Sequence, residues 1–146
     1  MPAPAHATVE KSWEIASDLA AAHQLVADVA IFLEGHGWSQ ESVFAVHMAM
    51  DEALTNAVKH GNCCQSGKRI WVDLSLSDED VELSVRDEGC GFDPDHIPDP
   101  TAPEHLESVH GRGVLIIRSY MDEVHYNRKG NCIVMRRMRN RKGVAR

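Results

Sequence analysis

The sequence predicts an α+β protein, a two-layer sandwich in which one sheet is covered by helices. The predicted elements follow one another as strand, helix, helix, strand, strand, loop, helix, strand, strand. Neighbouring strands are joined by short turns, whereas a βαβ repeat would place a helix between successive strands. With 146 residues, 43% of them hydrophobic, the chain suits one domain with a core and is too short for two ordinary ones. We therefore expect a single domain over residues 1–146, with a core at about 9–138 and a basic tail at 139–146.

The first half of the chain predicts one strand followed by two helices. Residues 9–15 alternate between apolar and polar side chains, which is typical of a strand. Ser17-Asp18 supply N-cap chemistry for a helix that runs to about residue 34. Ser39 caps a second helix, which we expect to continue until the glycine at position 61 stops it.

The second half predicts two hairpins separated by an irregular stretch and a helix. The strands are expected at 70–76, 81–85, 123–127 and 132–138. Residues 93–110 show little periodicity, and a segment of that length within a compact domain is usually a lid or a disordered linker. The helix is expected to open at Gly111 and to end near Met121.

Charge and composition exclude several classes of function. The net charge is -7, and the last eleven residues hold six of the 15 basic groups, which leaves 9 basic against 22 acidic groups in the body. Such a body repels nucleic acid and attracts a basic protein surface. The sequence has neither a signal-peptide pattern nor an apolar run of membrane-spanning length. We expect a cytoplasmic protein that binds neither nucleic acid nor membrane, and whose four cysteines are free thiols.

Three groups of residues have the composition of a ligand site, and the first lies on the second helix. Glu52 and Asn56 are one turn apart, so that a carboxylate and an amide project from nearly the same side. Ala45 and Ala49 share that face and would leave room for a ligand. A solvated polar helix face would explain the same pattern.

The other two groups are rich in glycine. Asp87 leaves a strand and is followed by Gly89 and Gly91, an arrangement that suits close backbone approach to a planar ligand but also an ordinary tight turn. Gly111-Arg112-Gly113 precedes an apolar helix, where free backbone N–H groups favour a phosphate, although a glycine hinge would look the same. A Walker-type phosphate loop is absent from the sequence.

Together the three groups resemble the signature of the Bergerat-fold (GHKL-type) ATPases. Residues 52–61 resemble the N-box of that family, 87–92 its G1 box and 110–113 its G2 box, in the family's order. The run from Gly111 to Val124, together with Tyr126-Asn127, is most similar to the RsbW-like anti-sigma-factor serine kinases. The resemblance covers nearly the whole chain and implies a mixed, mainly antiparallel sheet with helices on one face.

The resemblance implies a role for each matching residue at the base and the metal. Asp87 would read the adenine amino group, and Gly89 and Gly91 would let the loop approach the base. Asn56 would be the protein ligand of Mg²⁺. Glu52 would be the general base that accepts the proton of the attacking hydroxyl.

At the phosphates, the resemblance implies contacts from backbone and basic groups. Gly111 and Gly113 would expose backbone N–H groups, while Arg112 and Lys59 could approach the phosphates. The segment from 93 to 110 would be the lid over the nucleotide, and we expect it to be mobile or collapsed without nucleotide.

The implied activity is ATP- and Mg²⁺-dependent phosphorylation of a serine or threonine on an anti-anti-sigma (STAS-type) partner. The same protein, often a homodimer in that family, would sequester a sigma factor. The sequence departs from the family pattern at two places, and the first keeps an alternative open, namely a module that binds proteins under ATP control without phosphoryl transfer. Ser108-Val109-His110 stands where kinases of this branch often carry an arginine, and Asn131-Cys132 replaces the family's usual threonine near the base. The catalytic domain of a histidine kinase is a third possibility, disfavoured because no helix with a phosphoacceptor histidine precedes the N-box.

Overall fold

The computed structural model describes residues 8–62, 67–89, 109–127 and 130–139, with the backbone alone for 109–114. In chain order the elements are β1 (Val9–Ala16), α1 (Leu19–Gly35), α2 (Gln40–Asn56), the π-helical turn η1 (Ala57–Gly61), β2 (Arg69–Leu76), β3 (Asp80–Asp87), α3 (Val109–Tyr120), β4 (Glu123–Tyr126) and β5 (Cys132–Met138). The expected order of strands and helices is confirmed.

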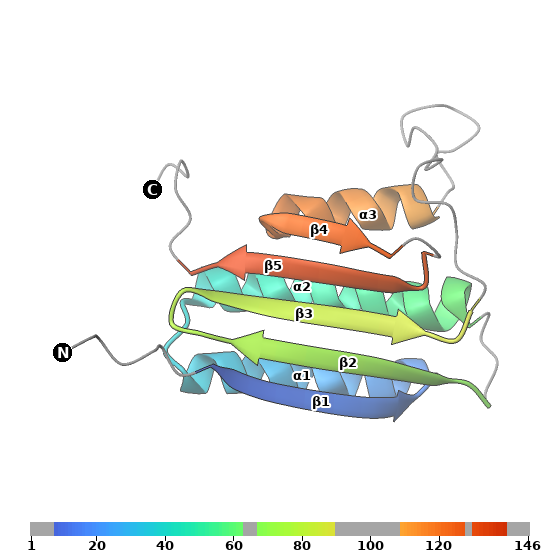
Figure 1. Cartoon of the computed structure of the whole chain (residues 1–146), viewed down its shortest axis with the longest axis horizontal. Helices are drawn as coiled ribbons and strands as arrows, with labels where there is room; N and C mark the ends of the chain where they lie inside the picture. The colour runs from blue at the N-terminus through green and yellow to red at the C-terminus, as the bar shows by residue number, and fades with distance from the viewer. Residues whose placement is uncertain (1–7, 63–66, 90–108, 128–129, 140–146) are drawn as a thin grey trace.

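The five strands form one sheet in the order β1-β2-β3-β5-β4, and all four neighbouring pairs are antiparallel. Figure 1 shows the three helices on the same side of this sheet, with α2 between α1 and α3. The α+β two-layer sandwich predicted from the sequence is therefore confirmed, with β4 and β1 as the two edges of the sheet.

The core lies between the sheet and its helices because alternate strand residues face inward. In β2 the inward residues are Ile70, Val72, Leu74 and Leu76, all buried. The register aligns them with inward residues of β1 and β3, so that Val72 stands between Trp13 and Val85. The helices contribute their own buried stripes, among them Leu33 of α1 and Leu54 of α2, both 0% exposed.

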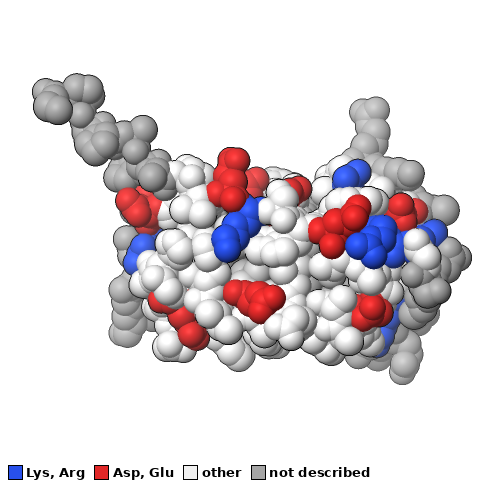
Figure 2. Space-filling view, turned by 90° about the horizontal axis from the view of Figure 1, so that it is seen from below, with Lys and Arg blue, Asp and Glu red and all other residues white. Residues whose placement is uncertain are grey.

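The outer face of the sheet and the helix surfaces carry the charge. On the side lowest in Figure 1, where β1 and α1 run, Figure 2 shows acidic and basic side chains interspersed. No helix in the described ranges is long and apolar enough to cross a membrane.

Side-chain caps set the beginnings of α1 and α2. Asp18 Oδ1 accepts a 2.8 Å hydrogen bond from the N–H of Ala21, and Ser39 Oγ accepts one of 3.1 Å from the N–H of Ser42. These bonds satisfy N–H groups that have no partner within the helix. Both predicted N-caps are thereby confirmed. The turn between the helices contains Gly37 at a φ of 80°, a conformation that costs glycine little.

Two helix boundaries differ from those predicted. The α-helical part of α2 ends at Asn56, and the π-helical turn η1 follows where a continuous helix was expected to reach residue 60. The N–H of Asn62 closes this turn with a 2.7 Å bond to the carbonyl of Ala57, a five-residue step. Helix α3 begins at Val109, so that Gly111-Arg112-Gly113 lies inside its first two turns instead of opening it.

A buried arginine joins the helix layer to the sheet. Arg137 of β5 is 2% exposed and faces inward. Its guanidinium donates to the Oγ of Ser42 at 3.3 Å and to the backbone carbonyl of Tyr120 at 2.5 Å. One side chain of the sheet therefore contacts the beginning of α2 and the end of α3.

Candidate functional site

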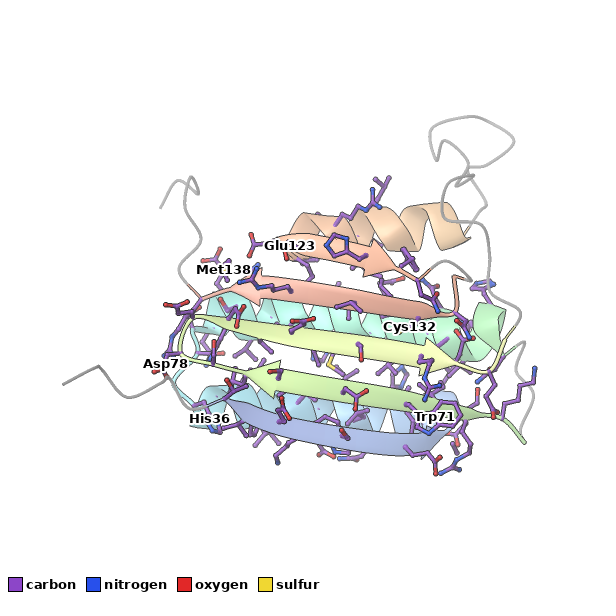
Figure 3. All side chains as sticks on the ribbon, in the orientation of Figure 1. His36, Trp71, Asp78, Glu123, Cys132 and Met138 are labelled. Carbon is purple, nitrogen blue, oxygen red and sulfur yellow. The ribbon has the colours of Figure 1, made fainter. Side chains whose placement is uncertain are left out.

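A pocket lies at the end of the sheet where β3 finishes and β5 begins, the end that Cys132 marks in Figure 3. Its empty space, including the part open to solvent, is about 490 Å³. It is lined by Ala53, Asn56, Ala57, His60, Gly61, Val85, Asp87, Ile117, Tyr126, Gly130, Asn131, Cys132 and Ile133. Three helical elements, three strands and the β4–β5 turn thus contribute to the pocket lining.

The end of α2 brings an unsatisfied acceptor to this pocket. The Oδ1 atom of Asn56 is buried and has no hydrogen-bond partner among the described residues. Burying a polar atom without a partner is costly, so its retention points to a ligand that supplies one. The π-helical turn follows directly, and functional sites are where such turns are frequently found.

The small residues expected to leave room for a ligand lie elsewhere. Ala45 and Ala49 are 2% and 0% exposed and do not line the pocket, because α2 packs against neighbouring helices along that stretch. Ala53 and Ala57, further along the helix, line the pocket instead. Alanines do lie beside Asn56 in the pocket, as expected, but they are Ala53 and Ala57 and not Ala45 and Ala49.

Asp87, the last residue of β3, is held by its neighbours on two sides. Its Oδ1 accepts a 2.7 Å bond from the N–H of Gly89, which fixes the carboxylate over its own loop. Its backbone N–H donates to the carbonyl of Asn131 at 3.0 Å, and its carbonyl accepts from Nδ2 of Asn131 at 3.2 Å. The carboxylate is thus an acceptor in a fixed position on the pocket wall.

Close packing of the backbone brings the π-helical turn against this loop. A Cβ atom added to Gly61 would lie 2.2 Å from Oδ2 of Asp87, and one added to Gly89 would lie 1.8 Å from the carbonyl oxygen of Gly61. Neither position can hold a side chain without moving its neighbour. The role expected for Gly89, close approach to a base, is accompanied here by close approach to the N-box turn.

The β4–β5 turn closes the other side of the pocket. The Oδ1 atom of Asn127 accepts from the N–H groups of Gly130, Asn131 and Cys132, and Gly130 has a φ of 80°. These bonds hold Asn131 where it contacts Asp87. Asn131 and Cys132 both line the pocket.

The titratable groups on that side are neutral at ordinary pH. Burial raises the pKa of the Tyr126 hydroxyl to about 12, against a smaller lowering effect of Arg118. Burial also raises the pKa of the Cys132 thiol. The hydroxyl of Tyr126 and the thiol of Cys132 therefore add no negative charge to the pocket lining at neutral pH.

The structure brings some of the predicted site residues together and leaves others apart. Asn56 and Asp87 line the same pocket, although 31 positions separate them in the chain. Glu52 is partly exposed and lies one turn before Asn56, outside the pocket lining. Lys59 is exposed and also lies outside it, so its contact with phosphate stays a prediction.

The remaining predicted residues are covered only in part. Gly91 and residues 93–108 of the lid expected at 93–110 lie outside the described residues, whereas 109 and 110 begin α3. Gly111, Arg112 and Gly113 lie in the first turns of α3, and the side chain of Arg112 is not described. Ile117 of the same helix lines the pocket, and the contact of residues 111–113 with a nucleotide stays a prediction.

Sequence reasoning assigned no position in the site to Gly61 or Tyr126 and overlooked Asn62. The sequence predicts that Gly61 stops the helix. Its position two residues after Lys59, a predicted phosphate contact, also indicates that it lies near the site. Asn62 is 0% exposed and makes side-chain hydrogen bonds to three other residues. The sequence indicates the burial of Asn62 only weakly, since a polar residue directly after a helix-ending glycine is usually exposed.

These features define the pocket as a candidate nucleotide site in an α+β domain. Residues 15–137 match the sequence model of the family described as "Histidine kinase-like ATPase domain". The match covers most of the chain, and the protein therefore belongs to this family.

Known relatives agree with the resemblance predicted from the motifs. The chain is 30% identical over 105 residues to the "Serine-protein kinase RsbW" of Oceanobacillus iheyensis. The aligned region covers 68% of this chain and 66% of that protein. It is 30% identical over 99 residues to the "Anti-sigma F factor" of the same organism, covering 66% and 67%. It is 29% identical over 115 residues to the "Serine-protein kinase RsbW" of Listeria innocua, covering 74% and 73%. The chain thus spans about two thirds of the length of the first two relatives.

A solved structure shows the same fold. The crystal structure of the RsbU and RsbW domains of Rv1364c from Mycobacterium tuberculosis superposes with a TM-score of 0.60 at 20% sequence identity. The superposition covers 92% of this chain and 35% of the other. At that identity the similarity concerns the fold alone.

Proposed function

We propose that this protein binds ATP with Mg²⁺ in the pocket and phosphorylates a serine or threonine of an anti-anti-sigma (STAS-type) partner. In its unphosphorylated form the partner would compete with a sigma factor that the protein otherwise sequesters. Membership of the histidine kinase-like ATPase family supports nucleotide binding. The names of the relatives, a serine-protein kinase and an anti-sigma factor, support the kinase activity and the sigma-factor partner.

One observation carries the proposal, namely that Asn56 and Asp87 meet in a single pocket. The buried Oδ1 of Asn56 is an oxygen ligand of the hard type that Mg²⁺ prefers. The carboxylate of Asp87 can only accept hydrogen bonds, as recognition of an exocyclic amine requires. No cluster of three or more His, Cys, Asp or Glu within the described ranges could hold a metal by itself, so phosphate oxygens and water would complete the coordination of Mg²⁺.

Each residue would then have a separate task. ATP with Mg²⁺ would supply the phosphoryl group and the charge neutralisation that its transfer needs. Asp87 would hold the adenine, and Asn56 would hold the metal beside the phosphates. Glu52, one turn before Asn56 and partly exposed, would accept the proton of the partner's hydroxyl from the solvent side.

Phosphorylation would release the partner through charge. A phosphoryl group adds a charge of about -1.5 to -2 to the partner at neutral pH. The body of this protein carries 22 acidic against 9 basic groups, so the two surfaces would repel. We propose in addition that the protein acts in the cytoplasm, where its partners would be found, and as a homodimer, which sedimentation analysis would test.

The experiment measures ATP binding with and without magnesium by calorimetry, and then phosphoryl transfer from labelled ATP to candidate partners. We expect Asn56→Ala to lose magnesium-dependent binding and Glu52→Gln to bind normally but to transfer at least about 100-fold more slowly. Glu34→Gln is the matched control, because Glu34 is exposed at the end of α1 and should leave both steps unchanged.

Two outcomes would contradict the kinase assignment. Binding without transfer to any partner would favour the ATP-controlled binding module, which the position of Glu52 outside the pocket lining also favours. A protein that binds no nucleotide at all would refute both functions.

A further inference from the structure

We infer that Asn62 is a positioning residue for Asp87 and that it sets the base selectivity of the pocket through the backbone of Glu88. This inference rests on the proposed function, since it concerns how the ATP site distinguishes one base from another. Asn62 has no part in the motifs that predicted the site, and it does not line the pocket.

Asn62 is fully buried and bonds to three separate parts of the fold. Its Nδ2 donates to the Oγ of Ser17 at 3.0 Å and to the carbonyl of Arg69 at 3.1 Å. Its Oδ1 accepts from the N–H of Glu88 at 2.8 Å. The first two bonds reach the β1–α1 junction and the start of β2, while the third reaches the residue next to Asp87.

The residue after Asp87 is held a second time by its own side chain. Oε2 of Glu88 accepts a 2.9 Å bond from the backbone N–H of Arg69. Residue 88 is therefore fixed to β2 directly and through Asn62. Asn131 fixes Asp87 itself from the opposite side. Asn131 holds the backbone of residue 87, and Asn62 and Arg69 hold residue 88. These contacts together fix the position of the Asp87 carboxylate.

The backbone of the same residue also links this loop to the helix that carries Asn56. The backbone N–H of Asn62 closes the π-helical turn at Ala57, directly after Asn56. Gly61 in that turn packs against the carboxylate of Asp87. Asn62 thus sets the distance between the end of α2 and the base-reading loop.

Base selectivity depends on this position because the two competing bases differ at one group. Adenine presents an amine that donates to a carboxylate, whereas hypoxanthine presents a carbonyl oxygen that the carboxylate repels. A carboxylate in a fixed position therefore favours adenine over hypoxanthine. A mobile carboxylate can move away from the carbonyl oxygen, so that hypoxanthine also binds. Loosening the loop should therefore reduce selectivity more than it reduces phosphate-dependent binding.

The test compares the dissociation constants of ATP and ITP, measured by calorimetry with magnesium. We expect the parent protein to prefer ATP by at least about tenfold and Asn62→Ala to reduce this preference to about twofold. Ser17→Ala is the matched control, because it removes another bond of Asn62 within the same buried network while leaving the bond to Glu88 intact. It should lower thermal stability and keep the preference for ATP.

A double substitution separates positioning from simple loss of stability. Asp87→Asn alone should abolish the preference, and adding Asn62→Ala to it should change the ratio no further if Asn62 acts through Asp87. If Asn62→Ala does not fold, Asn62→Ser takes its place, since its shorter side chain loses the reach to the N–H of Glu88 while it keeps a polar group in the buried network. We expect that variant to lose about threefold in selectivity.

The outcomes distinguish this inference from the proposed function. A parent protein without ATP binding overturns both. A parent that prefers ATP, with the same preference in Asn62→Ala or in its substitute Asn62→Ser, overturns the positioning role and leaves the nucleotide site in place. Equal loss of selectivity in Ser17→Ala would also overturn it, because general destabilisation would then be the cause.

Discussion

At the scale of single residues, two glycines determine how closely the site is assembled. Gly61 and Gly89 contact each other and the carboxylate of Asp87 so closely that a methyl group at either position overlaps existing atoms. Their importance comes from space and not from a positive φ, since the described glycines with positive φ are Gly37 and Gly130. Substitution at these two positions should therefore act through packing.

Gly61→Ala should destabilise the protein and weaken ATP binding, because the new Cβ lies within 2.2 Å of Asp87. Overpacking of this kind costs about 1–3 kcal/mol of unfolding free energy. Urea unfolding and calorimetry measure the two effects. Gly35→Ala is the control, since nothing lies within 4 Å of its added Cβ, and it should leave binding unchanged. Equal stability of the two variants would contradict the close packing.

Tyr126 should make the stability of the protein depend on pH in the alkaline range. Burial raises its pKa from 10.0 to about 12, so the folded protein retains a proton that the unfolded chain releases. The resulting stability is present below pH 10.0 and is lost as pH rises towards 12. Between these values the free energy of unfolding should fall with a slope of up to about 1.4 kcal/mol per pH unit. Tyr126→Phe should show a shallower fall in alkaline urea titrations, and an identical slope would refute the assignment.

At the scale of elements, the sequence predicted most of the fold through local patterns. Alternation predicted the strands, and Asp18 and Ser39 located the starts of α1 and α2. The π-helical turn after Asn56 could not be predicted, because it depends on Asn62, whose bonds reach residues 17, 69 and 88. Such contacts exist only once the sheet has formed.

The candidate site was predictable to a similar degree. Asn56 and Asp87 each had an ordinary alternative explanation, and only the resemblance of three motifs in order predicted that they would meet. Tyr126 and Gly61 were not assigned to the site, since pairing of β4 with β5 and the π-helical turn bring them there. The roles of Glu52 and Lys59 stay predictions. Neither residue lines the pocket, and the described contacts do not test what either residue does.

Helix capping offers a test at this scale. Ser39→Ala removes the acceptor for the N–H of Ser42 and should lower the unfolding free energy by about 1 kcal/mol. Ser119→Ala is the matched control within α3, where the hydroxyl donates to the carbonyls of Leu115 and Ile116. That substitution should be neutral or slightly stabilising. Urea unfolding of both variants measures the difference, and equal effects would argue against the cap.

At the scale of the whole molecule, the helix layer is attached to one face of the sheet by apolar packing and by Arg137. This arginine is 2% exposed and bonds to groups at the beginning of α2 and the end of α3. The ion pairs of Arg136 with Asp80 and Glu123 lie on the solvated face of the sheet and connect strands only. The two neighbouring arginines therefore have different structural roles.

Arg137→Ala should lower the unfolding free energy by about 3–5 kcal/mol, because the carbonyl of Tyr120 and the hydroxyl of Ser42 lose a buried partner. Arg118→Ala, at an exposed position of α3, is the control and should change stability by less than about 0.5 kcal/mol. Thermal unfolding measures both. Since Arg137 does not line the pocket, the folded fraction of Arg137→Ala should bind ATP normally, and lost binding would contradict this separation.

The π-helical turn has a consequence for how this protein can be altered by engineering. A π turn contains one residue more than the α-helical turn that it replaces. If residues 57–61 were all kept but wound as regular α-helix, the extra residue would rotate everything after it by about 100° around the helix axis. His60 and Gly61 would then leave the pocket wall. A more regular and intrinsically more favourable helix is therefore incompatible with this pocket, and selection for stability alone would tend to remove the site.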